Sequence, residues 1–429
     1  MKKFFATWLL TAIATFLFAQ TKVDNIINAK EVERIERVLA SDEMKGRRVF
    51  SPEIDKAADF IAAEFKAAGL ETWKNSGTYR QEFAVFNPRF ISASGTVNGA
   101  AVEMRYIAVV THEPTVTVNE KSGFETASIA AGANLFTEAQ KLVRSGKNYV
   151  VLVDTSHTRS FRFLSSFKRG VAKLTNTVVF VASTEQQLTT YSIEAKHEVA
   201  EQKLANVVGI IPGKSKKDEY VIFSGHYDHI GIGKPVDGDS IFNGANDDAA
   251  GTTAVILLAN YYKALNNNER TIIFAAFTAE ESGGYGAQYF SKQFDPAKVS
   301  AMFNIEMIGT ESKWGKNSAY ITGFDKTDMG AILQKNLEGS GFNFHPDPYP
   351  TQNLFYRSDN ATLARLGVPA HTISTSKMDS EPNYHKVSDE VETLDLDNMT
   401  MIIKSIALSA RSIVSGKDSP TRVKVEELR

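Results

Sequence analysis

Five short segments of this 429-residue sequence gather the residue types that bind divalent metals or move protons. They span residues 224–229, 243–251, 278–283, 304–309 and 383–385. The chain has no cysteine, so a metal site here must be built from imidazoles and carboxylates. Divalent ions of hard or borderline character accept both kinds of ligand when thiolates are absent. The segments therefore point to metal-assisted chemistry.

One residue of each segment can serve as a metal ligand. The set holds two imidazoles and three carboxylates: His226, Asp247, Glu281, Glu306 and His385. Two metal ions about 3.5–4 Å apart need a bridging carboxylate and one or two further ligands each. Asp247 could form the bridge. His226 and Glu306 would then complete one ion, and Glu281 and His385 would complete the other.

A proton acceptor stands beside one of these ligands. A water held between two metal ions has a depressed pKa, and a neighbouring carboxylate that is not a ligand can take its proton. Glu280, adjacent to Glu281, fits this description. We expect it to act first as a general base and then as a general acid.

Each of these residues also has a simpler explanation when taken alone. A single histidine after a strand is usually a loop or core side chain, and an acidic residue before a helix, such as Asp247, is usually a cap. A Glu-Glu pair most often faces water. Glu306 follows an apolar run, where a buried carboxylate without a partner would be costly. The simple explanations do not account for all five residues occurring in this order.

The segments alternate with stretches that read as strands and helices. Strands are expected over residues 81–86, 205–211, 220–224, 271–277, 301–305 and 371–374, and helices over 29–46, 52–68, 251–262, 285–293, 328–337, 361–366 and 396–414. Such alternation predicts an α/β fold with a central, mostly parallel or mixed sheet covered by helices on both faces. Functional residues of such sheets lie at the carboxyl ends of strands, where these segments fall.

The character of the chain changes between residues 93 and 203. Short β-like runs at 149–154 and 177–181 are separated by polar stretches and by one expected helix at 138–144. We expect a small inserted domain that contains β-structure over 93–203, and a main domain formed by residues 20–92 and 204–429.

The N-terminus carries the pattern of a secretory signal peptide over residues 1–19. Lys2 and Lys3 precede an apolar run from Phe4 to Phe18, which is short for a membrane span. No cysteine follows it to carry a lipid. The net charge of −2, with mixed signs, does not favour nucleic acid. We expect an exported monomer, periplasmic or secreted, with no stable membrane span after cleavage.

The sequence resembles peptidase family M28, the group of zinc aminopeptidases with two co-catalytic zinc ions. The matching motifs are His226-Tyr227-Asp228, Asn246-Asp247-Asp248 with Gly251, Glu280-Glu281, Asn304-x-Glu306-Met307-x-Gly309 and Tyr384-His385. Further similarity covers Gly46-Arg47, Gly69-Leu70 and residues 205–209. The resemblance spans most of the chain.

The resemblance implies a zinc exopeptidase fold and two Zn²⁺ ions. It assigns the same five ligands with Asp247 bridging, Glu280 as base and acid, and Asp228 as the residue that orients the imidazole of His226. It also implies a cis peptide bond between Asp247 and Asp248. Position 306 is Glu where many aminopeptidases of the family have Asp. His229 is expected to be a loop residue near the site, and His371 a core residue.

Residues 355–359 resemble a family segment that lines the active site. Tyr356 could stabilise the tetrahedral intermediate through a hydrogen bond, and Arg357 could meet a substrate carboxylate. Ser358 and Asp359 complete the predicted substrate-binding group. Ordinary loop packing is an equally good explanation of Tyr356. The inserted domain is weakly similar to the protease-associated domain common in the family.

The sequence thus predicts a zinc-dependent exopeptidase whose partner is a peptide, and most specifically an aminopeptidase that removes N-terminal residues. Glu306 keeps a carboxypeptidase or dipeptidase of the same fold open. A glutaminyl cyclase-like transferase would typically use one zinc and lack the ligand at His226. A non-catalytic peptide-binding relative would usually have lost ligands or the base, and all of them are present here.

Overall fold

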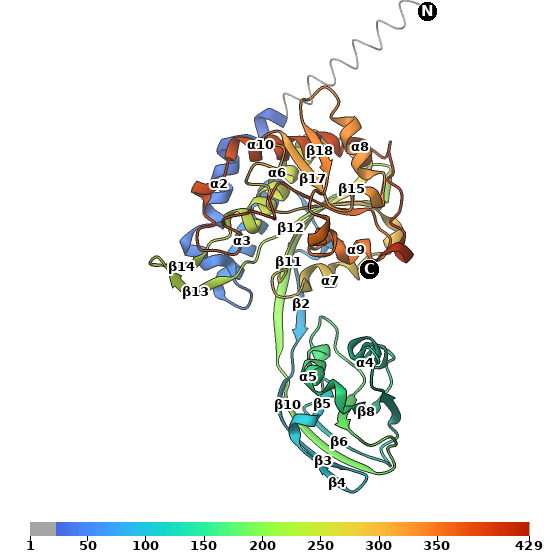
Figure 1. Cartoon of the computed structure of the whole chain (residues 1–429). Coiled ribbons are helices and arrows are strands. Elements are labelled where there is room, and N and C mark those ends of the chain that lie inside the picture. The colour runs from blue at the N-terminus through green and yellow to red at the C-terminus, as the bar shows by residue number, and fades with distance from the viewer. Residues whose placement is uncertain (1–22, 429) are drawn as a thin grey trace, which may run out of the picture. The chain divides into compact units, whose positions relative to one another are not determined.

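The computed structural model describes residues 23–428 and divides into two compact units (Figure 1). One unit comprises Phe83–Lys203, and the other comprises the chain up to Glu82 together with the chain from Leu204 onward. The predicted signal peptide lies outside the described residues. Within residues 23–428, no helix has both the length and the apolar character that a membrane crossing requires.

The larger unit is built on a nine-stranded sheet with the order β1-β11-β15-β12-β16-β19-β17-β18, and β2 pairs with β11 beside this path. Its strands are β1 (Glu71–Thr72), β2 (Arg80–Phe86), β11 (Glu201–Ile211), β12 (Lys216–His226), β15 (Arg270–Phe277), β16 (Val299–Ile305), β17 (Ser318–Ile321), β18 (Asn343–Pro346) and β19 (Ala370–Ser374). The central strands β15, β12, β16 and β19 are parallel, whereas β11 and β17 run antiparallel to their neighbours β15 and β19. This confirms the predicted mixed α/β sheet.

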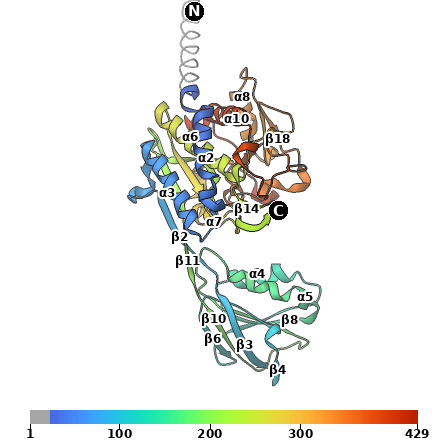
Figure 2. The same cartoon turned by 90° about the vertical axis from the view of Figure 1, so that its left-hand side faces the viewer.

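Helices cover both faces of this sheet (Figures 1 and 2). The helices of this unit are α2 (Ala29–Leu39), α3 (Pro52–Ala67), α6 (Ala250–Leu265), α7 (Tyr285–Ser291), α8 (Met329–Asn336), α9 (Asn360–Ala364), α10 (Leu396–Ser409) and α11 (Arg411–Val414). Helices α2, α3, α6, α8 and α10 pack on one face, and α7 and α9 pack on the other. A separate hairpin is formed by β13 (Gly231–Val236) and β14 (Asp239–Phe242).

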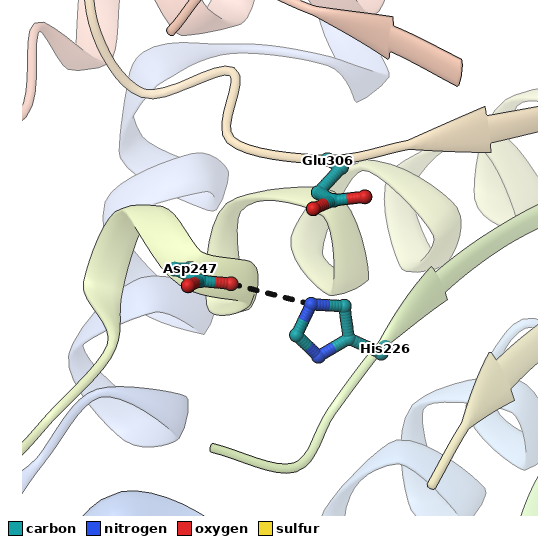
Figure 3. Close-up of side chains that lie close together, drawn as sticks. All are labelled: His226, Asp247 and Glu306. Atoms are coloured by element: carbon teal, nitrogen blue, oxygen red, sulfur yellow. Dashed lines mark ion pairs between the residues drawn. The ribbon is translucent and has the colours of Figure 1, made fainter. Parts of the chain in front are cut away.

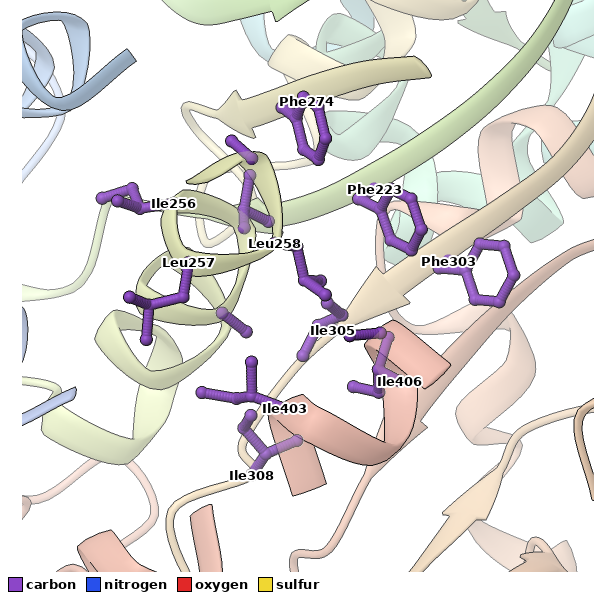
Figure 4. Packing of buried hydrophobic residues seen from close by; sticks show 14 of the residues in the cluster. Phe223, Ile256, Leu257, Leu258, Phe274, Phe303, Ile305, Ile308, Ile403 and Ile406 are labelled. Carbon is purple, nitrogen blue, oxygen red and sulfur yellow. The ribbon is translucent and has the colours of Figure 1, made fainter. Parts of the chain in front are cut away.

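Successive side chains along each strand point to opposite faces of the sheet, and they contribute to a hydrophobic core on each face. In β12, Phe223 points into the larger core and Ile222 into the smaller one. The Phe223 ring lies 5.7 Å from that of Phe274 and 4.8 Å from that of Phe303, its register partners on β15 and β16 (Figure 4). Because apolar side chains are buried on both faces, β15 reads as a nearly continuous apolar run.

Two expected helices end differently from the prediction. The first ends at Leu39 and is followed by 3₁₀ turns over Asp42–Arg47, because Lys45, Gly46 and Arg47 have positive φ angles that no α-helix contains. The closing helix is divided at Ala410 into α10 and α11.

The smaller unit holds two four-stranded sheets, with the orders β4-β3-β10-β6 and β5-β9-β8-β7. Its elements are β3 (Arg89–Val97), β4 (Ala100–Val102), β5 (Ile107–Val110), β6 (Thr115–Asn119), β7 (Glu125–Ile129), α4 (Leu135–Arg144), β8 (Tyr149–Asp154), α5 (Thr158–Phe161), β9 (Val178–Ser183) and β10 (Tyr191–Glu198). The strands expected in the insertion thus lie in a compact unit, and its assignment as an inserted domain over 93–203 stays a prediction. Residue 93, its expected start, falls inside β3, which pairs with β10 along its length.

Candidate metal centre

The predicted ligands come from the carboxyl ends of the parallel strands and from one helix start. His226 is the last residue of β12, and Glu306 directly follows β16. Glu280 and Glu281 follow β15 after a short turn. Asp247 lies in the single turn Ala245–Ala249 that leads into α6. Since parallel strands end at one edge of the sheet, these side chains are brought together there.

His226, Asp247 and Glu306 form the first cluster, with one potential ligand atom of each within 4.8 Å of the others. The imidazole Nε2 of His226 lies 3.2 Å from Oδ1 of Asp247. Figure 3 shows the three side chains converging from β12, the turn before α6 and the end of β16. His226 and Asp247 are buried.

The second cluster is formed around the other oxygen of Asp247. Nε2 of His385 lies 3.2 Å from Oδ2 of Asp247 and 3.1 Å from Oε1 of Glu281. The carboxylate of Asp247 therefore lies between two groups of ligands, one on each of its oxygens. This is the geometry a bridging carboxylate requires.

Several carboxylate oxygens of these clusters are buried with few partners. Glu306 Oε2 has no hydrogen-bond partner, and Asp247 Oδ2 and Glu281 Oε1 have only the imidazole nitrogens of His229 and His385 near them. Burying charged oxygens without partners is costly. A divalent cation would satisfy them, and imidazole with carboxylate is a donor set that zinc accepts. The residues present therefore fit a zinc site.

The imidazoles and carboxylates of the second cluster shift each other's pKa values. Contacts with Asp247 and Glu281 raise the pKa of His385 to about 10. Burial opposes ionisation of Glu281, but His229 and His385 outweigh it and lower the pKa of that carboxyl to about 2. Glu281 is therefore held as a carboxylate, the form that binds metal.

Sequence analysis placed His229 near the site without a role, and the structure brings it into contact with Glu281. Its Nδ1 lies 2.9 Å from Oε1 of Glu281 and 3.9 Å from Oδ2 of Asp247. The only signal in the sequence is its position three residues after His226. His371, by contrast, is a core residue as expected, bonded to the Thr322 carbonyl oxygen and the Thr327 hydroxyl.

Asp228 holds the first cluster through two different atoms. Its backbone carbonyl oxygen lies 3.0 Å from Nδ1 of His226, which fixes the orientation of that ring. Its carboxylate Oδ1 is farther from the ring, at 3.8 Å, and accepts a 3.0 Å hydrogen bond from the backbone N–H of Glu280. Asp228 thus contacts both a predicted ligand and the predicted base.

Three further residues, not included among the predicted site residues, tie the ligand segments together. The carboxylate of Asp248 accepts from the backbone N–H groups of His226, Gly251 and Met307, at 3.1, 3.0 and 3.1 Å. The carboxylate of Asp389 accepts from the backbone N–H groups of Asn246 and Asp247. The peptide bond between Asp247 and Asp248 is cis, as the resemblance implies.

Arg47 is the third of these residues and is fully buried. Its guanidinium donates to the carbonyl oxygens of Leu39, Tyr227, Asn243 and Gly244 at 2.6–2.9 Å. It therefore connects the end of α2, the residue after His226 and the loop before Asp247. The sequence offered one signal, the family-like Gly46-Arg47.

A cavity joins the two clusters to a mixed apolar and polar wall. Its lining comprises Asp247, Glu280, Glu281, Glu306, Met307, Tyr320, Thr322, Leu354, Arg357, Ser358, Thr372, Ser374, Met378, Tyr384 and His385. Tyr384, which belongs to a family-like motif but was not among the predicted site residues, stacks on the ring of His385 with centroids 4.0 Å apart. The cavity lies directly beside the clusters.

The predicted substrate-binding residues are divided between this lining and its surroundings. Arg357 and Ser358 line the cavity, and Ser358 Oγ accepts from the Asn304 side chain at 2.7 Å. Asp359 is buried behind it, with neither carboxyl oxygen hydrogen-bonded. Tyr356 lies outside the lining, with its ring against Phe355 and below the guanidinium of Arg365. Its role as an oxyanion stabiliser stays a prediction.

The fold and the metal-ligand geometry together are those of a metallopeptidase of the α/β class. Residues 206–410 match the model of Peptidase family M28, and this part of the chain belongs to that family, which confirms the resemblance.

Relatives with curated names match over part of their length. A probable leucine aminopeptidase of Trichophyton verrucosum is 30% identical over 203 residues, which cover 45% of this chain and 53% of the relative. A probable zinc metalloprotease of Pyrenophora teres f. teres is 26% identical over 239 residues, covering 52% and 51%. The chain thus spans about half the length of these curated relatives.

Solved structures show the same fold over nearly the whole chain. A zinc aminopeptidase from Bacillus subtilis has a TM-score of 0.56 at 17% identity and covers 92% of this chain and 97% of its own. An aminopeptidase from Aneurinibacillus sp. strain AM-1 has a TM-score of 0.53 at 17% identity, covering 95% and 98%. These likenesses confirm the predicted zinc exopeptidase fold.

Proposed function

We propose that this chain is a zinc-dependent aminopeptidase that removes N-terminal residues from peptides with two zinc ions. The supporting observation is the convergence of the four other predicted ligands around the two carboxylate oxygens of Asp247, with Glu280 in the same cavity. His226 and Glu306 would hold one ion, and Glu281 and His385 the other. The relatives named leucine aminopeptidase and zinc metalloprotease agree with this proposal.

When bound, two zinc ions supply a water of lowered pKa and polarise the scissile carbonyl group. Glu280 would serve as the general base and then as the general acid of the hydrolysis, with the proton held at its carboxylate between the two steps. Its partly buried setting raises the pKa of Glu280 well above the ordinary value, which makes its carboxylate a better proton acceptor. The hydrogen bond from the Glu280 backbone N–H to the Asp228 carboxylate fixes the position of the backbone that carries this base.

Charge in the cavity is closely balanced once the proposed metal is counted. Four carboxylates line it, from Asp247, Glu280, Glu281 and Glu306. Two zinc ions would carry four positive charges, so net charge alone does not select one end of a peptide. The longer side chain of Glu306 reaches the same cluster that Asp would reach in other members.

We also propose that the protein is exported and acts as a monomer. Support for export is the charged and apolar pattern of residues 1–19. The predicted ligands contain no thiol, so an oxidising environment outside the cytoplasm would not damage this metal site.

The test is hydrolysis of Leu-Gly-Gly and of its N-acetyl counterpart by zinc-loaded protein, with metal content measured on the same sample. We expect release of leucine from the free peptide alone and about two zinc ions per chain. Cleavage of the acetylated peptide from its carboxyl end would overturn the aminopeptidase assignment. One zinc per chain, with cyclisation of an N-terminal glutamine, would identify a glutaminyl cyclase-like enzyme.

A further inference from the structure

The cavity beside the metal centre carries one permanently positive side chain. Arg357 lines it, and no other lysine or arginine does so among the described residues. The cavity also holds four carboxylates, yet within residues 23–428 no carboxylate lies within ion-pair distance of Arg357. Its guanidinium donates one long side-chain hydrogen bond of 3.3 Å, to the amide oxygen of Gln352. The guanidinium is therefore available to a ligand.

The backbone that carries Arg357 is held firmly on both sides. The N–H of Arg357 donates to the Leu354 carbonyl oxygen at 3.0 Å, which closes a 3₁₀ turn. The next residue, Ser358, is hydrogen-bonded to Asn304 on β16, one of the strands that carry the ligands. The position of Arg357 relative to Glu306 is thus set by the sheet itself.

Two other arginines of this unit stabilise the fold, and their surroundings differ from those of Arg357. Arg47 is buried on four carbonyl oxygens, and Arg270 is buried against Glu219 and two carbonyl oxygens. Arg357 is exposed instead and lines the cavity.

We propose that Arg357 is a specificity-determining residue that binds a carboxylate group of the peptide substrate. This inference rests on the proposed peptidase function. A guanidinium offers two parallel N–H donors that match a carboxylate, and such charged bonds are stronger than neutral ones. Apart from the proposed zinc ions, Arg357 is the one cation of the described lining that a substrate carboxylate could meet. The carboxylate is either the free C-terminus of a short peptide or an acidic side chain.

The experiment compares kcat/KM for matched substrates that differ only in one carboxylate. Leu-Gly against Leu-Gly-amide reports the C-terminal carboxylate. Leu-Asp-amide against Leu-Asn-amide reports a side chain at the second position, and Glu-Gly-amide against Gln-Gly-amide one at the first. We expect one of these ratios to be about tenfold or more in the wild-type protein. The pair that shows it identifies the source of the carboxylate.

The variant Arg357→Met should reduce that ratio toward one, because the loss falls on the carboxylate member of the pair. Lys313→Met is the matched control, since it removes an exposed positive charge that lies outside the cavity lining. It should keep the wild-type ratio. Three ratios near one in the wild-type protein, or an unchanged ratio in Arg357→Met, would overturn the inference.

A binding measurement separates this inference from the proposed function. Calorimetry reports the same preferences without turnover when each of the three substrate pairs is replaced by uncleavable analogues. In these analogues the scissile peptide bond is reduced, and the two members of a pair still differ only in one carboxylate. A carboxylate preference that disappears in Arg357→Met would support the role of Arg357 even in a protein that hydrolyses nothing. Equal affinity within every pair would overturn that role even in an active peptidase.

Discussion

Asp247 gives each of its two carboxylate oxygens to a different imidazole, His226 on one side and His385 on the other. The residue types and their order in the sequence predicted that these side chains would lie together, and their role as metal ligands stays a prediction. Spacing along the chain could not indicate that His229 approaches Glu281 at 2.9 Å, because that contact depends on the path of the loop after β12. Two histidines therefore lie next to one predicted ligand.

At this scale we predict that His385 is the ligand and that His229 positions Glu281. His229→Ala should still bind two zinc ions at saturation, with affinity for the weaker site lowered by about 10–100-fold, the usual effect of losing a residue that supports a ligand. His385→Ala should bind one. Zinc titration against a chelating dye measures both quantities. If His229→Ala binds one ion and His385→Ala two, the roles are exchanged.

At the scale of elements, apolar runs were enough to predict the central strands and the helices between them. The nearly continuous burial of β15 follows directly from its apolar sequence. The bonds that fix the ligand loops were not predictable in this way. The carboxylates of Asp248 and Asp389 accept from backbone N–H groups of distant segments, and Arg47 donates to backbone carbonyl oxygens. Every residue has such backbone groups, so residue types do not indicate which of them will be bound. Only the whole fold shows them.

Arg47→Lys tests the most connected of these residues. An ammonium group cannot reach four carbonyl oxygens, so buried acceptors lose their partners at a cost of about 1–3 kcal/mol each. We expect the free energy of unfolding of the metal-free protein to fall by about 3 kcal/mol or more in urea titrations, together with weaker zinc binding. The exposed neighbour gives the control, as Arg48→Lys should change stability by less than about 0.5 kcal/mol. Equal stability of both variants would refute the role of Arg47.

At the scale of the whole molecule, the predicted ligands, the base and the cavity lining all belong to the larger unit. The smaller unit has its own two apolar cores, around β10 and around β8. The sequence indicated the insertion through its change of pattern, although the unit takes in residues from Phe83. Its likeness to a protease-associated domain stays a prediction, since short alternating strands are common to many folds.

The central claim is that a two-zinc site and a separate carboxylate base hydrolyse peptides in the larger unit. The most direct measurement is the rate of leucine release together with zinc content for the adjacent variants Glu280→Gln and Glu281→Gln. We predict that Glu280→Gln keeps two zinc ions while kcat falls by about 10²–10⁴, and that Glu281→Gln loses zinc. A Glu280→Gln protein with two zinc ions and the wild-type rate would contradict the account.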